Sequence, residues 1–230
     1  MNQRETREIA GARIAVVGAT GALGSLLSAE LAARGARLLV VGRDADRLAG
    51  LEAEARLVAD LGDATAGDAV VVAAREQLGG LDGLVNAAGV VAFGALVDTP
   101  DEVIEELFLT NVVGPLFLLR RVLPLLEESQ GFVVQLSAVV AQQPLPRMAA
   151  YSASKAALSA AATALRTELR RSRVEVHDVR PPHTETGLAS RPLAGEAPRL
   201  PAGKDPAGVA RRVVDAIEAR ELDLGPEAFG

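Results

Sequence analysis

The chain has 230 residues, of which 49% are apolar and 23% are charged, a composition typical of a soluble globular protein with a sizeable core. The net charge is −6 and no basic cluster stands out, so we expect no nucleic-acid partner and no anionic membrane. Cysteine is absent, which excludes disulfides, thiol catalysis and Cys-ligated metals. Neither histidine lies in a metal-ligand spacing and the N-terminus lacks a signal-peptide core, so we predict no metal site and a cytoplasmic location.

Residues 1–10 are polar and charged, and we expect a flexible tail there, ahead of a single domain over residues 11–230. The domain opens with Ile14 to Val17, a short apolar run typical of a strand buried on both faces. A glycine-rich turn follows, and leucines at helical spacing come after it. A plain tight turn is the alternative, but this order favours a dinucleotide phosphate site, where glycines let the backbone approach the pyrophosphate and the helix N-terminus offers free N–H groups. The candidate cofactor residues are Gly18, Thr20, Gly21, Ala22, Leu23 and Gly24.

The second predicted strand, Arg37 to Val41, runs into Gly42-Arg43-Asp44. An NAD site usually presents an acid at the end of this strand, where it binds the ribose 2′-hydroxyl. Here Gly42 stands in place of that acid and Arg43 adds a cation, which suits the 2′-phosphate of NADP. Because Asp44 could reach back to the ribose, NAD(H) stays open as the alternative to NADP(H).

Three further strands are predicted at Leu57 to Ala59, Gly83 to Val85 and Phe132 to Leu136. Asp60 and Leu61 follow the first of them at its carboxyl end. The second runs into a stretch of small residues that would let a flat cofactor lie against the backbone, although an ordinary turn would also use them. These residues are Asn86, Ala87, Ala88 and Gly89.

A long helical region from Thr99 to Leu126 is predicted next, with Asn111 in its interior. Asparagine is unfavourable inside a helix unless its side chain has a specific role or points to water. The fifth strand leads into Ser137-Ala138, and a second long helix runs from Met148 to Arg171.

This second helix carries Tyr151 and Lys155, four residues apart and therefore on one face. A free tyrosine has a pKa of about 10, which makes it a poor base and a weak acid at neutral pH. A lysine ammonium one turn away stabilises the phenolate and lowers that pKa, so the hydroxyl can donate or accept a proton. The spacing alone is common on helices, and its meaning depends on the rest of the chain.

The remaining chain holds a sixth strand at Val174 to Val176, a proline-rich segment over residues 187–205 and a helix through Val209 to Ile217. A last short strand is predicted at Glu221 to Leu224. We expect residues 187–205 to form a flap over the substrate. Strand and helix alternate from end to end, which predicts a single-domain, doubly wound parallel α/β sheet with helices on both faces.

The order and spacing of these features resemble the short-chain dehydrogenase/reductase family over nearly the whole chain. The resemblance implies a Rossmann-type fold with strand order 3-2-1-4-5-6-7 and a nicotinamide cofactor. It implies hydride transfer between that cofactor and a small carbonyl or alcohol substrate, and a homodimer or homotetramer joined through the Asn111 and Tyr151 helices. The matching residues are Gly18, Gly21, Gly24, Asp60, Asn86 to Gly89, Asn111, Tyr151, Lys155, Pro181 and Thr186.

The resemblance also implies a role for each matching position. Tyr151 would be the general acid in carbonyl reduction or the base in alcohol oxidation, and Lys155 would lower its pKa and bind the nicotinamide ribose. Asn111 would anchor a water that relays protons to Lys155. Pro181 and Thr186 would contact the nicotinamide end of the cofactor, and the adenosine side would contact Asp60, Leu61 and Asn86.

One position departs from the family pattern. The family serine that binds the substrate oxygen lies thirteen residues before the tyrosine, and here that position is Ala138 (151 − 13 = 138). Ser137 is one residue earlier, and because side chains alternate along a strand we expect it to point away from where Ala138 points. Losing such a donor typically costs about 100- to 1,000-fold in rate.

Three outcomes of this substitution stay open. A bulge could turn Ser137 back toward the substrate, so it remains a candidate catalytic residue. Alternatively, Gln142, Gln143 or His183 could supply the donor, or the chain could bind its cofactor and turn over little. The sequence therefore predicts an NADP(H)-dependent oxidoreductase, with a catalytically weakened NADP(H)-binding sensor or regulatory protein as the alternative.

Overall fold

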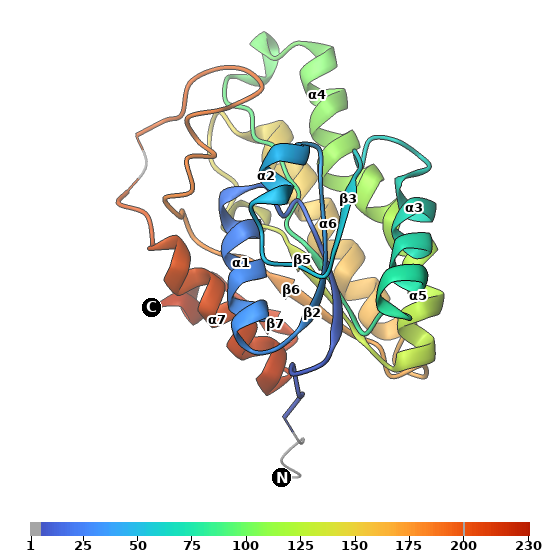
Figure 1. The fold of residues 1–230 in the computed structure, drawn as a ribbon. Coiled ribbons are helices and arrows are strands. Elements are labelled where there is room, and N and C mark those ends of the chain that lie inside the picture. The colour runs from blue at the N-terminus through green and yellow to red at the C-terminus, as the bar shows by residue number, and fades with distance from the viewer. Residues whose placement is uncertain (1–5, 200) are drawn as a thin grey trace.

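The structure of the protein is a computed structural model that describes residues 6–199 and 201–230. A seven-stranded parallel sheet lies at its centre, in the order β3-β2-β1-β4-β5-β6-β7 (Figure 1). This order confirms the predicted doubly wound Rossmann-type sheet, in which the chain reverses direction across the sheet between β1 and β4. The strands span Arg13–Val17 (β1), Arg37–Gly42 (β2), Ala55–Val58 (β3), Gly83–Asn86 (β4), Phe132–Leu136 (β5), Glu175–Val179 (β6) and Asp223–Leu224 (β7).

Helices cover both faces of the sheet (Figure 1). Helices α1 and α7 pack against each other on one face, while α3 and α5 pack together on the other, where α6 also contributes to the core. The α-helices span Ala22–Ala33 (α1), Ala45–Ala49 (α2), Ala66–Ala73 (α3), Asp101–Phe108 (α4), Gly114–Ser129 (α5), Ala149–Glu168 (α6) and Pro206–Ala219 (α7). Single π-helical turns lie at Ala74–Leu78 (η1) and Leu109–Val113 (η3). Short 3₁₀ turns lie at Leu96–Asp98 (η2), Val139–Ala141 (η4) and Pro226–Phe229 (η5).

The central strand β1 contributes to two apolar cores at once. Ala15 and Val17 pack into the core under α3, α5 and α6, and Ile14 and Val16 pack into the core under α1 and α7. Successive side chains of a strand point to opposite faces of the sheet, and here both faces are covered by helices. This explains why the strand reads as an uninterrupted apolar run rather than as an alternating one.

Strand β6 runs to Val179 and ends directly before Arg180-Pro181-Pro182. It includes His177 and Asp178, and both side chains are almost completely buried. A buried polar group is costly unless it has a hydrogen-bond partner. In this fold the pair is bonded, because His177 Nδ1 lies 2.7 Å from the Glu221 carbonyl oxygen and Asp178 accepts from Ser137.

The helical region predicted from Thr99 is continuous from Asp101 to Ser129, with the π-helical turn η3 around Asn111. Its length and apolar composition would allow it to cross a membrane, and half of its most apolar window is buried inside the fold. A core helix of a soluble protein passes the same test when it is packed in this way. The expectation that the chain has no membrane partner stays a prediction.

The predicted flexible tail is wrong for the part of it that the structure describes, while residues 1–5 lie outside the described residues. The Arg7 backbone N–H donates to the Glu218 carbonyl oxygen over 2.8 Å, and its guanidinium pairs with Glu175 on β6. Ile9 is only 2% exposed, in the core under α1 and α7. Composition did not reveal this packing, because one apolar residue and one distant ion pair are enough to fix the segment.

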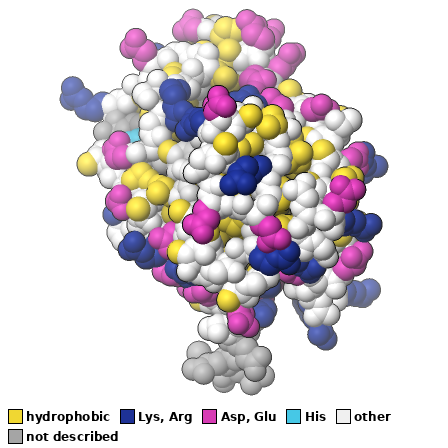
Figure 2. All heavy atoms as spheres, in the orientation of Figure 1, with side chains coloured by type: hydrophobic (Ala, Val, Ile, Leu, Met, Phe, Trp, Pro, Cys, Tyr) yellow, Lys and Arg dark blue, Asp and Glu magenta, His cyan; other side chains and the backbone are white. Residues whose placement is uncertain are grey.

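The surface drawn in Figure 2 shows acidic and basic side chains interspersed over the face that carries α1 and α3 (Figures 1 and 2). Many of these charges are paired at the surface, as Arg37 is with Glu54 and Arg121 is with Asp68. Such exposed pairs contribute little to stability, about 0–1 kcal/mol each.

Candidate active site

A cavity of about 690 Å³ lies at the carboxyl ends of the strands. In open α/β sheets this is where ligands bind, next to the point at which the strand order reverses. The cavity brings together most of the residues that the sequence analysis selected. Those that line it are Gly18, Thr20, Gly21, Ala22, Leu23, Gly24, Arg43, Asp60, Leu61, Ala87, Ala88, Gly89, Ser137, Tyr151, Lys155, Pro181 and Thr186.

The turn between β1 and α1 needs its glycines. Gly18 has a φ of +77°, and a Cβ at this position would lie 2.5 Å from the backbone nitrogen of Ala88. A Cβ on Gly24 would lie 2.2 Å from the Gly18 carbonyl oxygen. Gly21 begins α1 without any side-chain hydrogen bond to the first turn, so the N–H groups of that turn are available to a ligand. A close-packed turn with an open helix N-terminus fits the pyrophosphate of a dinucleotide.

At the end of β2, the Thr20 side chain packs closely against Gly42. A Cβ on Gly42 would lie 2.8 Å from Thr20 Cγ2 and 2.9 Å from Thr20 Oγ1. Asp44, the acid that sequence reasoning left open for NAD, accepts from the Arg47 backbone N–H over 3.0 Å and so begins α2 as its N-cap.

Two arginines line this end of the cavity. Arg43 pairs with Asp60 at 3.5 Å, with both side chains more than half exposed. Arg47 lies one turn of α2 further along, and sequence reasoning missed it. The spacing of four residues from Arg43 on a predicted helix was the available signal.

Asn86 and Asn111 do not line the cavity and instead support its walls. Asn86 donates to Gln135 over 2.7 Å, which links β4 to β5, and it accepts from the Ala88 N–H. Asn111 is fully buried: its Oδ1 accepts from the Val90 N–H and its Nδ2 donates to the Val90 carbonyl oxygen and to Ser154 Oγ. These bonds fix the segment after β4 against α6. A role for Asn111 in anchoring a water stays a prediction.

Tyr151 and Lys155 lie on the face of α6 that lines the cavity, and both are less than 10% exposed. Lys155 Nζ donates to the Leu136 carbonyl oxygen at the end of β5 over 3.0 Å. Burial raises the pKa of Tyr151 to about 12. Burial lowers the pKa of Lys155 to about 8, against the opposing effect of the Asp178 carboxylate. In the protein alone the tyrosine is thus a protonated acid at neutral pH, and the lowered tyrosine pKa expected from the sequence is not found there.

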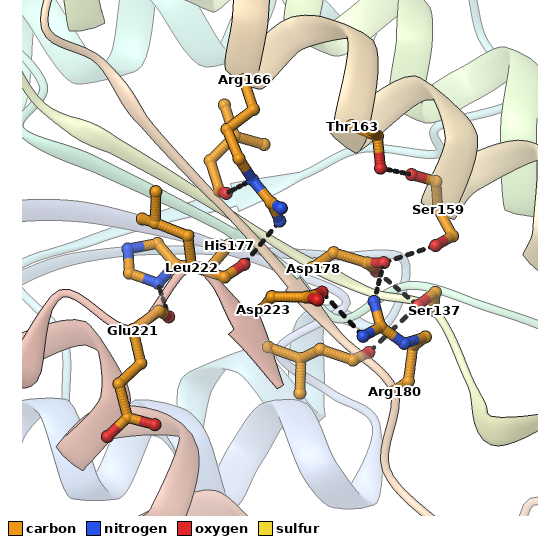
Figure 3. Close-up of polar contacts among 12 residues, drawn as sticks. Ser137, Ser159, Thr163, Arg166, His177, Asp178, Arg180, Glu221, Leu222 and Asp223 are labelled. Carbon is orange, nitrogen blue, oxygen red and sulfur yellow. Dashed lines mark hydrogen bonds and ion pairs between the residues drawn. The ribbon is translucent and has the colours of Figure 1, made fainter. Parts of the chain in front are cut away.

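The Ser137 hydroxyl is bonded to β6 in this structure. Its hydroxyl donates to Asp178 Oδ1 over 2.5 Å and lies 3.2 Å from the Val179 carbonyl oxygen, on the side of β6 (Figure 3). Ala138 continues in extended conformation, with a φ of −169° and a ψ of 162°, so no bulge redirects the serine. Ser137 lines the cavity, but its hydroxyl is bonded to Asp178, and its candidate catalytic role stays a prediction. Of the three suggested substitutes, His183 lines the cavity.

The flap is packed onto the segment that follows β4. Leu193 N–H donates to the Val91 carbonyl oxygen and Phe93 N–H donates to the Ala194 carbonyl oxygen, over 2.8 Å and 2.9 Å. A Cβ on Gly195 would lie 1.9 Å from the Phe93 carbonyl oxygen. The cavity wall beside Tyr151 is mainly apolar; its residues from the flap lie in the segment predicted to cover the substrate, and sequence reasoning did not identify the others. They are Val90, Val91, Phe93, Val139, Val140, Leu145, Met148, Leu188, Ala189 and Leu193.

Comparison with known proteins identifies the family. A family profile described as short chain dehydrogenase matches residues 12–196, which is most of the chain. The chain belongs to the short-chain dehydrogenase family. It is 30% identical to dehydrogenase/reductase SDR family member 7B of Bos taurus, over 94% of this chain and 73% of that protein. It is 28% identical to an uncharacterized oxidoreductase of Staphylococcus saprophyticus, over 90% of this chain and 91% of the relative.

Solved structures of short-chain dehydrogenases have the same fold. The chain superposes with a TM-score of 0.84 on one from Streptomyces avermitilis, at 26% identity over 95% of this chain and 89% of that one. A member from Burkholderia phymatum, solved in complex with NAD, gives a TM-score of 0.87 at 23% identity, over 96% of this chain and 90% of that one. The short-chain dehydrogenases are oxidoreductases that bind a nicotinamide cofactor, and the glycine turn and open α1 N-terminus of this chain fit such a ligand.

Proposed function

We propose that this chain is an NADP(H)-dependent oxidoreductase that interconverts a small carbonyl compound and the corresponding alcohol. The observation that carries the proposal is the placement of Tyr151 and Lys155 in the same cavity as the glycine turn of β1 and α1. The acid–base pair and the cofactor site therefore share one enclosed space. When bound, the nicotinamide supplies or takes up the hydride.

Each residue of the pair has a defined part in this proposal. The Tyr151 hydroxyl donates its proton to the carbonyl oxygen in reduction and takes a proton back in alcohol oxidation. The Lys155 ammonium, one helical turn away, stabilises the phenolate that remains after proton transfer. Burial raises the pKa of Tyr151 to about 12, so the phenolate depends on this stabilisation.

We propose NADP(H) in preference to NAD(H) from the residues around the end of β2. The short distances from Gly42 to Thr20 disfavour the acid that an NAD site would need there, and Asp44 already caps α2. Arg43 and Arg47 both line the cavity, and two guanidinium groups suit a phosphate on the adenosine ribose.

The apolar wall beside Tyr151 supports a substrate whose carbonyl is attached to an apolar body. Val91, Phe93, Val140 and Met148 form a buried cluster with Tyr151. An apolar wall binds hydrocarbon or aromatic groups and offers nothing to a second charge on the substrate. His183 is the cavity residue that could donate a second hydrogen bond to the substrate oxygen in place of the family serine.

The experiment that tests this function is oxidation of NADPH, and in parallel of NADH, over a panel of ketones, diketones, quinones and aldehydes. We expect turnover with apolar carbonyls and a higher kcat/KM for NADPH than for NADH. The Tyr151→Phe variant removes only the hydroxyl, and we expect it to lose at least about 100-fold in kcat while still binding NADPH. Full activity in that variant would exclude the proposed acid–base role.

A second function is supported by Ala138 and by the bonding of Ser137 to Asp178: an NADP(H)-binding sensor or regulatory protein with weak catalysis. Tight NADPH binding without turnover of any carbonyl in the panel would favour it. Appearance of turnover in Ala138→Ser would then show that only the donor was missing. We place this function second because Tyr151 and Lys155 still line the cavity together.

We also propose that the chain assembles with itself through the α4–α5 region and α6. In support, α5 exposes Leu116 and Phe117, at 39% and 42%. Exposed apolar side chains on one helix are a common feature of surfaces between subunits. Equilibrium sedimentation of the protein tests the assembly. The cytoplasmic location is a separate matter and stays a prediction.

A further inference from the structure

We propose that Asp178 is a positioning residue for the Tyr151–Lys155 pair, acting as a buried carboxylate on β6 that fixes β5 and α6 relative to each other. The inference rests on the proposed function and adds a residue that lies outside the cavity. We call Asp178, Ser137, Ser159 and Arg180 the Asp178 cluster. Asp178 lies on β6 and Ser159 on α6, while Ser137 and Arg180 directly follow β5 and β6.

The carboxylate of Asp178 is 1% exposed and bonded through both oxygens. Its Oδ1 accepts from Ser137 Oγ over 2.5 Å, and its Oδ2 accepts from Ser159 Oγ and from the Arg180 guanidinium (Figure 3). Hydrogen bonds to an ionised group are roughly twice as strong as bonds between neutral groups. A carboxylate with three such partners is therefore a rigid link between the elements that carry them.

Two of these bonds lie next to Lys155. Ser159 is four residues after Lys155 on α6, so the two side chains lie on the same face one turn apart. Ser137 directly follows Leu136, whose carbonyl oxygen accepts from Lys155 Nζ. Asp178 therefore binds both the helical turn beside Lys155 and the residue beside its acceptor. Loss of the carboxylate would free α6 to move against the end of β5.

The cluster also holds charge near the ammonium. The Asp178 carboxylate opposes the effect of burial on Lys155 and so favours its charged form. Arg180 is 4% exposed and binds both Asp178 and, over 2.7 Å, Asp223 at the start of β7. Two further titratable groups line the cavity with Lys155: Tyr151, on the same helix, and His183. Arg180 thus places an opposite charge directly against the buried carboxylate.

This arrangement gives Ser137 a use that the family pattern does not suggest. With Ala138 in the position of the family serine, the hydroxyl one residue earlier bonds to Asp178 and not to the substrate. The sequence signal was present in Asp178 and Arg180, two opposite charges at the end of a predicted strand. Their partners, Ser137 and Ser159, are distant in sequence, and the fold was needed to connect them.

The test uses the small number of lysines and tyrosines in the chain. Lys155 and Lys204 are the two lysines and Tyr151 is the only tyrosine. In a Lys204→Arg background, carbon NMR of labelled lysine therefore follows the ionisation of Lys155 alone. We would compare Asp178→Asn, which removes the charge, with Ser159→Ala, which removes only the bond to α6. Thr163→Ala is the control, because Thr163 donates to the Ser159 carbonyl oxygen on the same helix without contacting Asp178 (Figure 3).

We expect Asp178→Asn to lower the pKa of Lys155 by at least about one unit, and to lower kcat about 10-fold or more at unchanged KM for NADPH. Ser159→Ala should lower kcat while the pKa of Lys155 is unchanged, and Thr163→Ala should change neither quantity. Wild-type values of both kcat and the Lys155 pKa in Asp178→Asn would overturn the proposal. Should Asp178→Asn fail to fold, wild-type kcat in Ser159→Ala would overturn it equally.

The outcome for the cluster can be separated from the outcome for the proposed function. If the wild-type protein reduces no carbonyl, the proposed function fails, but the NMR titration needs no turnover. In that case a lowered Lys155 pKa in Asp178→Asn, together with a changed Tyr151 titration in Ser159→Ala, still supports the positioning role. Unchanged titrations in both variants overturn it.

Discussion

At the scale of single residues, the environment of Tyr151 decides which proton step is available. Its hydroxyl is protonated at neutral pH, as in a free tyrosine, and burial raises its pKa to about 12, which makes the phenolate harder to form without a nearby positive charge. Alcohol oxidation needs the phenolate instead, and positive charge next to the ring favours that form. Lys155 supplies one such charge from the same face of α6, and the oxidised nicotinamide carries another.

The ionisation of this tyrosine can be measured directly, because the chain has one tyrosine and no tryptophan. At pH 10 a free tyrosine is about half ionised, whereas a pKa of about 12 leaves only about 1% as phenolate. We therefore predict almost no phenolate absorbance from the folded protein at pH 10, with circular dichroism as the check that it is folded. Addition of NADP⁺ should raise the phenolate signal. Half ionisation at pH 10 in the folded protein without cofactor would contradict the buried environment.

At the scale of elements, the sequence predicts the β1–α1 turn well because its glycines are required by backbone contacts. The same reasoning placed Asn86 and Asn111 at the site, and the structure places both of them behind its walls. Sequence spacing shows that a side chain is near a strand end, but it does not show on which side of the wall the side chain lies. The apolar wall outside the flap was missed because its residues come from segments that are distant in sequence.

Gly24→Ala tests the contact that shapes this turn. The added Cβ would lie 2.2 Å from the Gly18 carbonyl oxygen, so the turn must open. We predict a loss of about 1–3 kcal/mol in the free energy of unfolding, typical of overpacking, and at least about tenfold weaker binding of NADPH. Gly50→Ala is the matched control, since the nearest atom to its Cβ would be 3.6 Å away and its φ is −79°.

Denaturant unfolding and titration of NADPH fluorescence measure the two effects. The free energy of unfolding of Gly50→Ala should stay within about 0.5 kcal/mol of the wild-type value. Equal affinity for NADPH in Gly24→Ala and Gly50→Ala would show that the turn does not bind the cofactor.

At the scale of the whole molecule, the buried polar residues of β6 limit stability in acid. His177 is 1% exposed; its Nδ1 donates to the Glu221 carbonyl oxygen, and its Nε2 has no hydrogen-bond partner among the residues that the structure describes. Burial lowers its pKa to about 4. Protonation would place a buried N–H without an acceptor beside the ring of Phe132, which it meets edge to face.

The lowered pKa of His177 predicts a range of pH over which the free energy of unfolding changes. Below pH 6.5 the unfolded chain protonates this histidine while the folded protein does not, so the free energy of unfolding falls as the pH falls. The loss should be about 1.4 kcal/mol per pH unit and should end near pH 4, where the folded protein also protonates. Lys155 and Tyr151 titrate above this window.

Denaturant unfolding at a series of pH values between 7 and 4 measures how the free energy of unfolding changes with pH. His177→Asn should be less stable overall, but its stability should change much less with pH in this window. The same slope in both proteins would assign the acid sensitivity to other groups.

The sheet order and the family could be predicted from sequence, because strands and helices alternate and the glycine, tyrosine and lysine positions are ordered along the chain. The Asp178 cluster could not, because it joins residues 137, 159 and 178 through tertiary contacts alone. Tight packing of Arg7 and Ile9 at the N-terminal end was hidden in the same way.

Hydride transfer itself is the most direct test of the central claim. The measurement is mass spectrometry of the alcohol formed from a carbonyl of the panel and NADPH that is dideuterated at C4 of the dihydronicotinamide. The account predicts that each alcohol molecule gains one deuterium at the former carbonyl carbon, and that Tyr151→Phe forms almost no labelled alcohol. An alcohol product without deuterium, or no alcohol from any carbonyl under saturating NADPH, would contradict it.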